Sequence, residues 1–187
     1  MSYSLEPAFL AQNELSRLIM KAGMKPENNW FFADGCFSAE SDLEHTPNTW
    51  QHENFIVVEN REIIAYLGAN WSKPLNIISN FRLINFNKSK GIIVTKAMFN
   101  YFDYIFVARG CKAFNWFVAE KNNHAHRVYE KFINHYFGHL AGTRHKAQMG
   151  YNGEISDVIL YEITDEEYFN WKNNNPSLKD KKTGFLL

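Results

Sequence analysis

The feature of this sequence that most restricts its fold is an ordered run of four elements between residues 77 and 138. Residues 77–86 have the pattern of a strand, residues 92–109 of a helix, residues 112–119 of a second strand, and a second helix follows Asn122 or Asn123 and ends at Gly138. A helix that joins two neighbouring strands places them parallel, in a right-handed crossover. We therefore expect a parallel β-α-β unit in the middle of the chain.

Antiparallel hairpins are predicted on both sides of this unit. The strand-like runs 55–59 and 62–67 are separated only by Asn60-Arg61, and the runs 140–149 and 155–163 flank Asn152-Gly153. A helix is predicted over Pro7–Ala22, and residues 25–53 are expected to form a long connection with a short strand at 30–33. The predicted fold class is α/β with a mixed sheet, antiparallel at both ends around a central parallel crossover.

Composition and charge narrow the class of protein. The chain has 187 residues, 45% of them hydrophobic, which is typical of a globular domain and excludes a disordered chain. We expect one domain over residues 1–171, with an N-terminal helix and loop region 1–54, a core 55–163 and a polar tail 172–187. The 20 basic and 20 acidic residues balance, so nucleic acid is not expected as the main partner. The lysines of the tail keep a minor nucleic-acid alternative open (Lys172, Lys179, Lys181 and Lys182).

The N-terminus lacks the pattern of a signal peptide, and no apolar stretch reaches the length of about 18 residues needed to span a membrane. We therefore expect a cytoplasmic protein with no membrane partner. The sequence also lacks paired cysteines with zinc-ligand spacing, and no metal is expected.

Two segments within the β-α-β-α run carry the candidate chemistry. Lys88-Ser89-Lys90-Gly91 opens the first helix, where unpaired N–H groups and the helix dipole favour an anion. The second segment, Asn122-x-x-Ala125-x-x-x-Tyr129-Glu130-Lys131, resembles the signature of the GNAT superfamily of acyl-CoA-dependent N-acyltransferases. The predicted order of elements over residues 55–163 is similar to the fold of that superfamily.

The resemblance implies that acetyl-CoA is the co-substrate and lies between two strands that separate from each other. It implies that the backbone of the central strand and the side chain of Asn122 hold the pantetheine arm, and that the following loop cradles the pyrophosphate. The implied residues are Leu83, Ile84, Asn85 and Phe86 in the strand and Lys88, Ser89, Lys90, Gly91 and Ile92 in the loop. Two positions depart from the family pattern. Lys88 stands where Gln or Arg is usual, and Ile93 replaces a small residue, where its bulk is expected to narrow the phosphate site.

The resemblance also assigns the chemistry. Tyr129 matches a tyrosine that protonates the leaving thiolate, a role that a phenol can fill. The attacking amine needs a base, and Glu120 at the end of the next strand is the nearest acidic candidate. The weaker candidates for this base are Glu59, Asp157, His45 and His52.

The predicted function is the transfer of an acetyl group from acetyl-CoA to a primary amine of an unidentified acceptor. The alternative is a GNAT-like binding or structural protein without catalysis. The resemblance includes a homodimer among the expected assemblies.

Overall fold

A computed structural model describes residues 2–23, 52–150 and 153–175 of the chain. The described residues form one seven-stranded sheet, in the order β1-β2-β3-β4-β5-β7-β6. The strands are β1 (Tyr3–Pro7), β2 (His52–Glu59), β3 (Glu62–Ser72), β4 (Ile77–Asn85), β5 (Ala113–Ala119), β6 (His139–Met149) and β7 (Ile155–Thr164). The strands β4 and β5 are parallel, and every other neighbouring pair is antiparallel. The predicted fold class is therefore confirmed.

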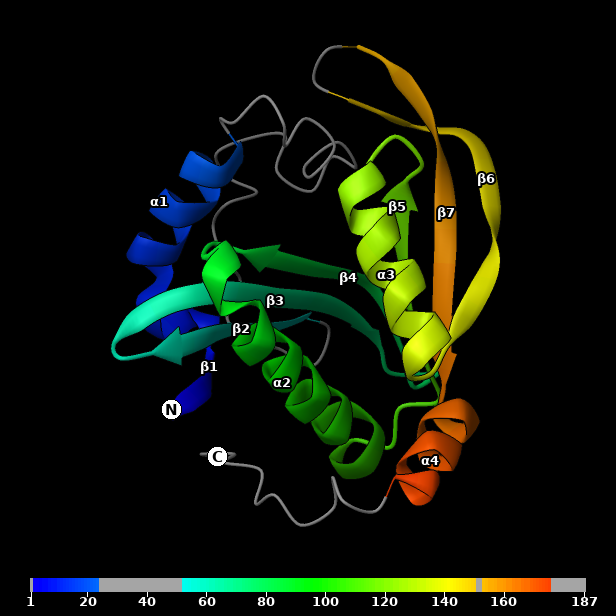
Figure 1. The fold of residues 1–187 in the computed structure, drawn as a ribbon, viewed down its shortest axis with the longest axis horizontal. Helices are drawn as coiled ribbons and strands as arrows, with labels where there is room; N and C mark the ends of the chain where they lie inside the picture. Colours follow the sequence, from blue (N-terminus) through cyan, green and yellow to red (C-terminus); the bar gives the residue numbers. More distant parts are fainter. Residues whose placement is uncertain (1, 24–51, 151–152, 176–187) are drawn as a thin grey trace.

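Helices cover both faces of this sheet (Figure 1). The helices are α1 (Gln12–Gly23), α2 (Gly91–Phe102), α3 (Asn123–His135) and α4 (Asp165–Asn174), and α2 continues into a π-helical segment, Asp103–Ala108. The helix α1 packs on one face of β2, β3 and β4 through Leu15 and Ile19, whereas α2 and α3 pack on the opposite face. None of the helices in the described part of the chain is long and apolar enough to cross a membrane.

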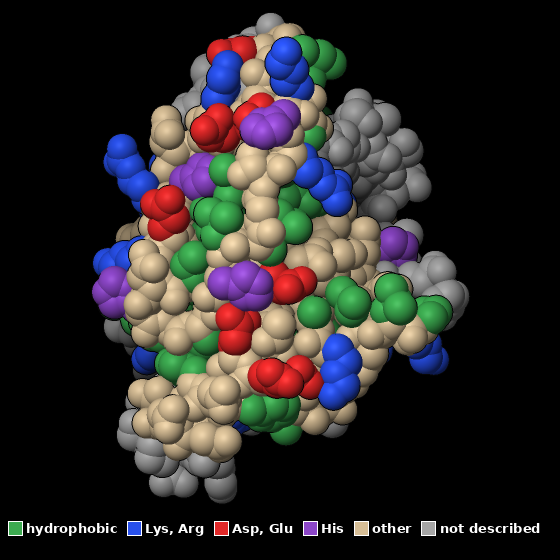
Figure 2. Space-filling model, turned by 90° about the vertical axis from the view of Figure 1, so that its right-hand side faces the viewer, with side chains coloured by type: hydrophobic (Ala, Val, Ile, Leu, Met, Phe, Trp, Pro, Cys, Tyr) green, Lys and Arg blue, Asp and Glu red, His purple; other side chains and the backbone are tan. Residues whose placement is uncertain are grey.

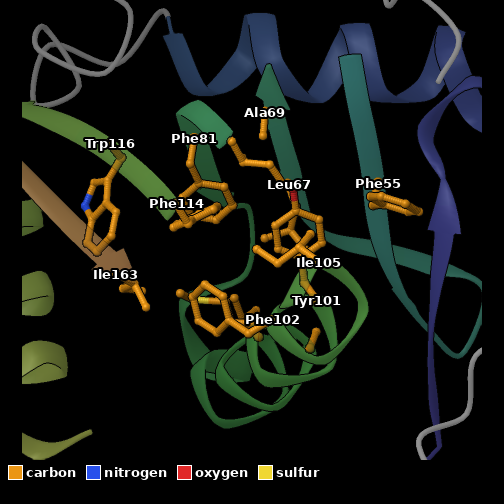
Figure 3. Packing of buried hydrophobic residues seen from close by; sticks show 14 of the residues in the cluster. Phe55, Leu67, Ala69, Phe81, Tyr101, Phe102, Ile105, Phe114, Trp116 and Ile163 are labelled. Atoms are coloured by element: carbon orange, nitrogen blue, oxygen red, sulfur yellow. The ribbon is translucent and has the colours of Figure 1, made fainter. Parts of the chain in front are cut away.

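The main core lies between the sheet and α2. Figure 3 shows Phe81 and Phe114 from the sheet facing Tyr101, Phe102 and Ile105 from α2 and its extension. Rings of Phe102 and Phe114 meet edge-on with their centroids 5.3 Å apart. The helix α2 has apolar residues on most of its sides because the sheet covers one flank and α3 and α4 cover another.

The strands β4 and β5 begin together and then separate. In the described chain they pair at two positions only, Ile77 with Ala113 and Ile78 with Phe114. Beyond these pairs β4 stays bonded to β3, whereas β5 is paired with β7 along its whole length, over seven positions that include Ala113 and Phe114. Figure 1 shows the ends of the two strands pointing in different directions, with the start of α2 beside one and α3 over the other.

A bulge in β4 lies next to the point of separation. The register between β3 and β4 shifts between Gly68 and Asn70, and Asn80 adopts a positive φ of 55°. Ile78 and Phe81 therefore both face α2, although two residues stand between them.

The turns and ends of elements show where the sequence was informative. Asn60 and Arg61 have φ of 51° and 65°, as a two-residue type I′ hairpin requires, so the predicted hairpin is confirmed.

The helix predicted from Pro7 is wrong at its start, because Pro7 ends β1 and a 3-10 turn over Ala8–Ala11 precedes α1. The helix α4 was not predicted, and it runs past residue 171, where the polar tail was expected to begin. The strand expected at 30–33 lies outside the described residues.

The edge strand β6 carries charged and polar side chains that are mostly exposed. Two of its histidines contact carboxylates, His139 beside Glu167 at 2.9 Å and His145 beside Asp157 at 2.7 Å. Figure 2 shows histidine, acidic and basic side chains interspersed on this side of the molecule. Bulges, a lysine and an arginine on an edge strand disfavour pairing with another strand.

Candidate active site

The residues predicted to hold the pantetheine arm lie on β4 beyond its pairing with β5. Leu83, Ile84 and Asn85 are in register with β3, and the N–H of Phe86 donates to the Ile64 carbonyl at 2.9 Å. The side chain of Leu83 packs on the α2 side and that of Ile84 on the α1 side. Because β5 has turned away at this level, one edge of β4 presents backbone groups that the β4–β5 ladder does not use.

The predicted phosphate loop forms one 3-10 turn and the start of α2. The side chain of Asn87 accepts hydrogen bonds from the N–H and the hydroxyl of Ser89, at 3.2 and 2.7 Å. Lys90 forms an ion pair of 2.7 Å with Glu59, a buried carboxylate at the end of β2. The charge of Lys90 is therefore compensated within the protein, and Lys88 is the exposed cation of the loop.

The start of α2 fits an anionic group. The side chain of its N-cap residue, Lys90, makes no hydrogen bond to the helix N-terminus in the described structure. A Cβ built on Gly91 would meet no described atom within 4 Å, so its backbone is open to a close approach. Ile92 next to it is 76% exposed. Unpaired N–H groups, a positive dipole end and a bare backbone are what a pyrophosphate needs.

Ile93 does not narrow this loop as the sequence suggested. Its side chain is buried in the core between α2 and the sheet. The helix start orients residue 93 toward the sheet, while Gly91 and Ile92 remain at the tip. The larger side chain at this position therefore packs in the core and does not occupy the tip of the loop.

The signature helix α3 begins as its sequence predicts. Asn122 is the N-cap, and its side-chain oxygen accepts from the N–H of Ala125 at 3.2 Å. Its amide NH2 is the group that remains to donate to a ligand. Two turns further on, the Tyr129 ring packs on Trp116 of β5, with centroids 5.2 Å apart. Burial raises the pKa of Tyr129 well above its ordinary value of 10, so its hydroxyl stays protonated at neutral pH.

The candidates for the base are scattered. Glu120 is exposed in the turn between β5 and α3, where its N–H donates to the Asp157 carbonyl at 2.8 Å. Asp157 contacts His145, Glu59 contacts Lys90, and His52 lies 3.1 Å from the Asn70 amide oxygen. His45 lies outside the described residues. The role of Glu120 as base stays a prediction.

One cluster around Tyr129 was missed from the sequence. Tyr161 of β7 is fully buried, stacks on Trp116 with centroids 5.4 Å apart, and lies 2.8 Å from Nδ1 of His126 on α3. His126 lies within the signature segment but is not one of the residues by which that segment resembles the family signature. Trp116 is an ordinary core residue by its pattern, and only the packing shows which polar atoms surround it.

Within the part of the chain that is described, no group of three or more His, Cys, Asp or Glu side chains is arranged to hold a metal ion. Lys172, one of the lysines of the nucleic-acid alternative, contacts Asp103 at the end of α2. The other three lie outside the described residues.

Comparison with known proteins identifies the fold. No protein-family model matches the chain, and a search of curated proteins finds no match. Among solved structures, a GCN5-related N-acetyltransferase from Brucella melitensis matches with a TM-score of 0.70 at 16% identity, over 94% of this chain and 81% of that one. A mutant form of the SpeG spermidine N-acetyltransferase from Vibrio cholerae matches with a TM-score of 0.67 at 18% identity, over 90% of this chain and 96% of that one. The chain therefore has the GNAT acetyltransferase fold, as the signature helix and the order of elements implied.

Proposed function

We propose that this protein is an N-acetyltransferase that moves an acetyl group from acetyl-CoA to a primary amine. The observation that carries the proposal is that β4 separates from β5 beside the start of α2, whose N-cap side chain makes no hydrogen bond to the helix. On the other side of this separation, the ring of Tyr129 from α3 packs on Trp116 of β5. A thioester donor needs these three elements together: backbone donors along its arm, an anion site for its phosphates and a proton donor near its sulfur. The likeness to acetyltransferases of known structure supports this assignment.

The thioester of acetyl-CoA supplies an activated acyl group with a thiolate leaving group. The α2 N-terminus with Gly91 and Lys88 would bind the phosphates, and β4 backbone groups beyond Ile78 would orient the arm and polarise the carbonyl. The acceptor amine attacks the carbonyl carbon as the free base, a C–N bond forms, the C–S bond breaks, and the nitrogen gives up one proton. The products are an amide and the free thiol.

In this proposal Tyr129 is the proton donor to the leaving sulfur. Its hydroxyl forms no hydrogen bond to any residue that the structure describes, so it has none to break when a ligand arrives. With its raised pKa, this phenol is a weaker acid than an ordinary thiol, whose pKa is near 8.5. Full transfer of its proton to the thiolate is therefore unfavourable. The hydroxyl therefore acts first as a hydrogen-bond donor that stabilises negative charge on sulfur, and solvent restores any proton it gives up.

The test is calorimetric titration with acetyl-CoA and CoA, followed by an assay of CoA release with a panel of primary amines. Tyr129→Phe should lower turnover about 100-fold or more, as expected for loss of a general acid, while CoA affinity changes little. Phe169→Leu, an exposed aromatic change on α4, is the control. Binding of acetyl-CoA without turnover of any amine would favour the non-catalytic alternative, and no binding would overturn the proposal. Glu120 as base, the cytoplasmic location and the homodimer stay predictions.

A further inference from the structure

Two buried carboxylates of β2 hold the two ends of α2 against the sheet. The side chains of β2 that face α2 alternate along the strand, with two core residues between two carboxylates, and they are Glu53, Phe55, Val57 and Glu59. Glu59 forms an ion pair of 2.7 Å with Lys90, the N-cap of α2. Glu53 forms one of 2.8 Å with Arg109, the C-cap of its π-helical extension.

The ion pair at the start of α2 is costly to break. The side chain of Glu59 is 4% exposed, whereas that of Lys90 is 32% exposed. A buried carboxylate that loses its cation is strongly destabilising. Lys90 therefore stays with Glu59 when an anion arrives at the helix. Its ammonium group determines where the helix begins and does not contact the anion.

The chain between β4 and α2 is also shaped by the side chains of two asparagines. Asn85 accepts from the N–H of Asn87 at 3.0 Å, and Asn87 accepts from the N–H of Ser89 at 3.2 Å. The N–H of Lys90 donates to the Asn87 carbonyl at 2.9 Å. These bonds are local, whereas the ion pair with Glu59 joins the turn to β2, which is separated from β4 by β3.

We propose that Glu59 is a positioning residue, which acts through Lys90 to fix the start of α2 where the phosphates of the acyl donor bind. This inference rests on the proposed function, because it names further residues that build the same site. An anion site whose backbone N–H groups are already held in place spends less binding free energy on ordering them. The pair should therefore strengthen donor binding although neither side chain contacts the donor.

Calorimetry with CoA on single and double variants tests this proposal. Glu59→Gln and Lys90→Met should each weaken CoA binding about tenfold. The double variant should be no weaker than either single variant, because both changes break one interaction. Lys90→Arg keeps the ion pair and should bind as the wild type does. Glu53→Gln is the matched control, since it alters an equally buried ion pair on the same strand at the other end of α2.

A second readout is the amine assay. There Glu59→Gln and Lys90→Met should raise the KM for acetyl-CoA about tenfold and leave kcat at saturating donor unchanged, because the reacting groups are untouched. A fall in kcat of the same size would show a general disturbance of the site and would overturn the inference.

The outcomes separate this inference from the proposed function. A wild-type protein that binds no CoA would overturn both. If the wild type binds CoA, wild-type affinity in both single variants would overturn this inference alone. So would a loss in only one of them, or tighter binding by Glu59→Gln, which would show that the released Lys90 contacts the phosphates itself. An equal loss in Glu53→Gln would show a merely structural role and would also overturn it.

Discussion

At the scale of single residues, Gly91 shows how the structure separates folding from binding. Its φ of −52° lies in the ordinary helical region, and a Cβ there would meet no described atom within 4 Å. The fold therefore does not require a glycine at this position. We predict that Gly91→Val weakens CoA binding about tenfold or more by blocking the backbone, while the free energy of unfolding changes by less than about 1 kcal/mol.

Lys96→Val is the matched control, because it places the same side chain on an exposed position of the same helix. Calorimetry gives the affinities, and urea unfolding gives the stabilities. Wild-type affinity in Gly91→Val would mean that the phosphates do not bind at the start of α2.

Glu53 gives a second prediction at this scale. Its carboxylate is buried near the end of α2 and accepts hydrogen bonds from Arg109 at 2.8 Å and Tyr104 at 3.2 Å. Burial raises the pKa of Glu53 above its ordinary value of 4.5, against the opposing effects of the Arg109 charge and the Tyr104 hydrogen bond. The folded state thus holds this proton more tightly than the unfolded state. The stability it contributes is present below the unfolded pKa and is lost as the pH rises through the folded pKa.

Glu53→Gln removes that titration. The stability of the variant relative to the wild type should therefore increase as the pH is raised from about 4 to about 7. Urea unfolding across this range measures the difference, and Glu62→Gln, at the exposed start of β3, is the control. A difference that is constant with pH, or that changes in the opposite direction, would contradict the assigned shift.

At the scale of elements, the sequence predicted those elements whose pattern is local. The hairpin at Asn60-Arg61, the cap at Asn122 and the crossover between β4 and β5 all follow from short-range signals. The helix α4 also has a local signal, because Thr164 and Glu167 form a capping box. It was not predicted because the helix buries few residues and its sequence therefore shows no clear apolar periodicity. The strand β1 had none, because it is an edge strand with only Leu5 buried, and pairing with β2 defines it.

The orientation of the helix α3 can be tested directly, because one face packs on the core and the other is exposed. Phe132 is buried, and its ring contacts Phe102 and Phe137 with centroids 5.8 and 5.2 Å away. Phe132→Ala should lower the free energy of unfolding by about 3–5 kcal/mol, because it leaves a cavity in the aromatic core. Val128→Ala on the exposed face of the same helix should cost less than about 1 kcal/mol. Equal losses for the two variants, measured by urea unfolding, would contradict the orientation of α3.

At the scale of the whole molecule, the candidate site exists because the sheet is divided. The loop at 88–92 and the signature at 122–131 were visible as motifs, but neither shows that β4 and β5 separate after two paired positions. The bulge at Asn80 and the ion pair between Glu59 and Lys90 depend on contacts between distant parts of the chain. Sequence periodicity carries no information about such contacts. The sequence therefore predicted which segments form the candidate site, but not how these segments are arranged relative to one another.

This division predicts how a ligand changes the motions of the chain. The β1–β4 half and the β5–β7 half share few strand hydrogen bonds, so amides of residues 79–86 should exchange faster than those of β7, which is paired on both sides. CoA bound between the halves should slow exchange at residues 79–86 and 91–93. At about 100 times its dissociation constant it should stabilise the fold by about 2.7 kcal/mol. Hydrogen exchange read by mass spectrometry, with residues 158–162 as the internal reference, measures this. Protection confined to β6 and β7 would place the ligand on the other side of the molecule and contradict the proposed site.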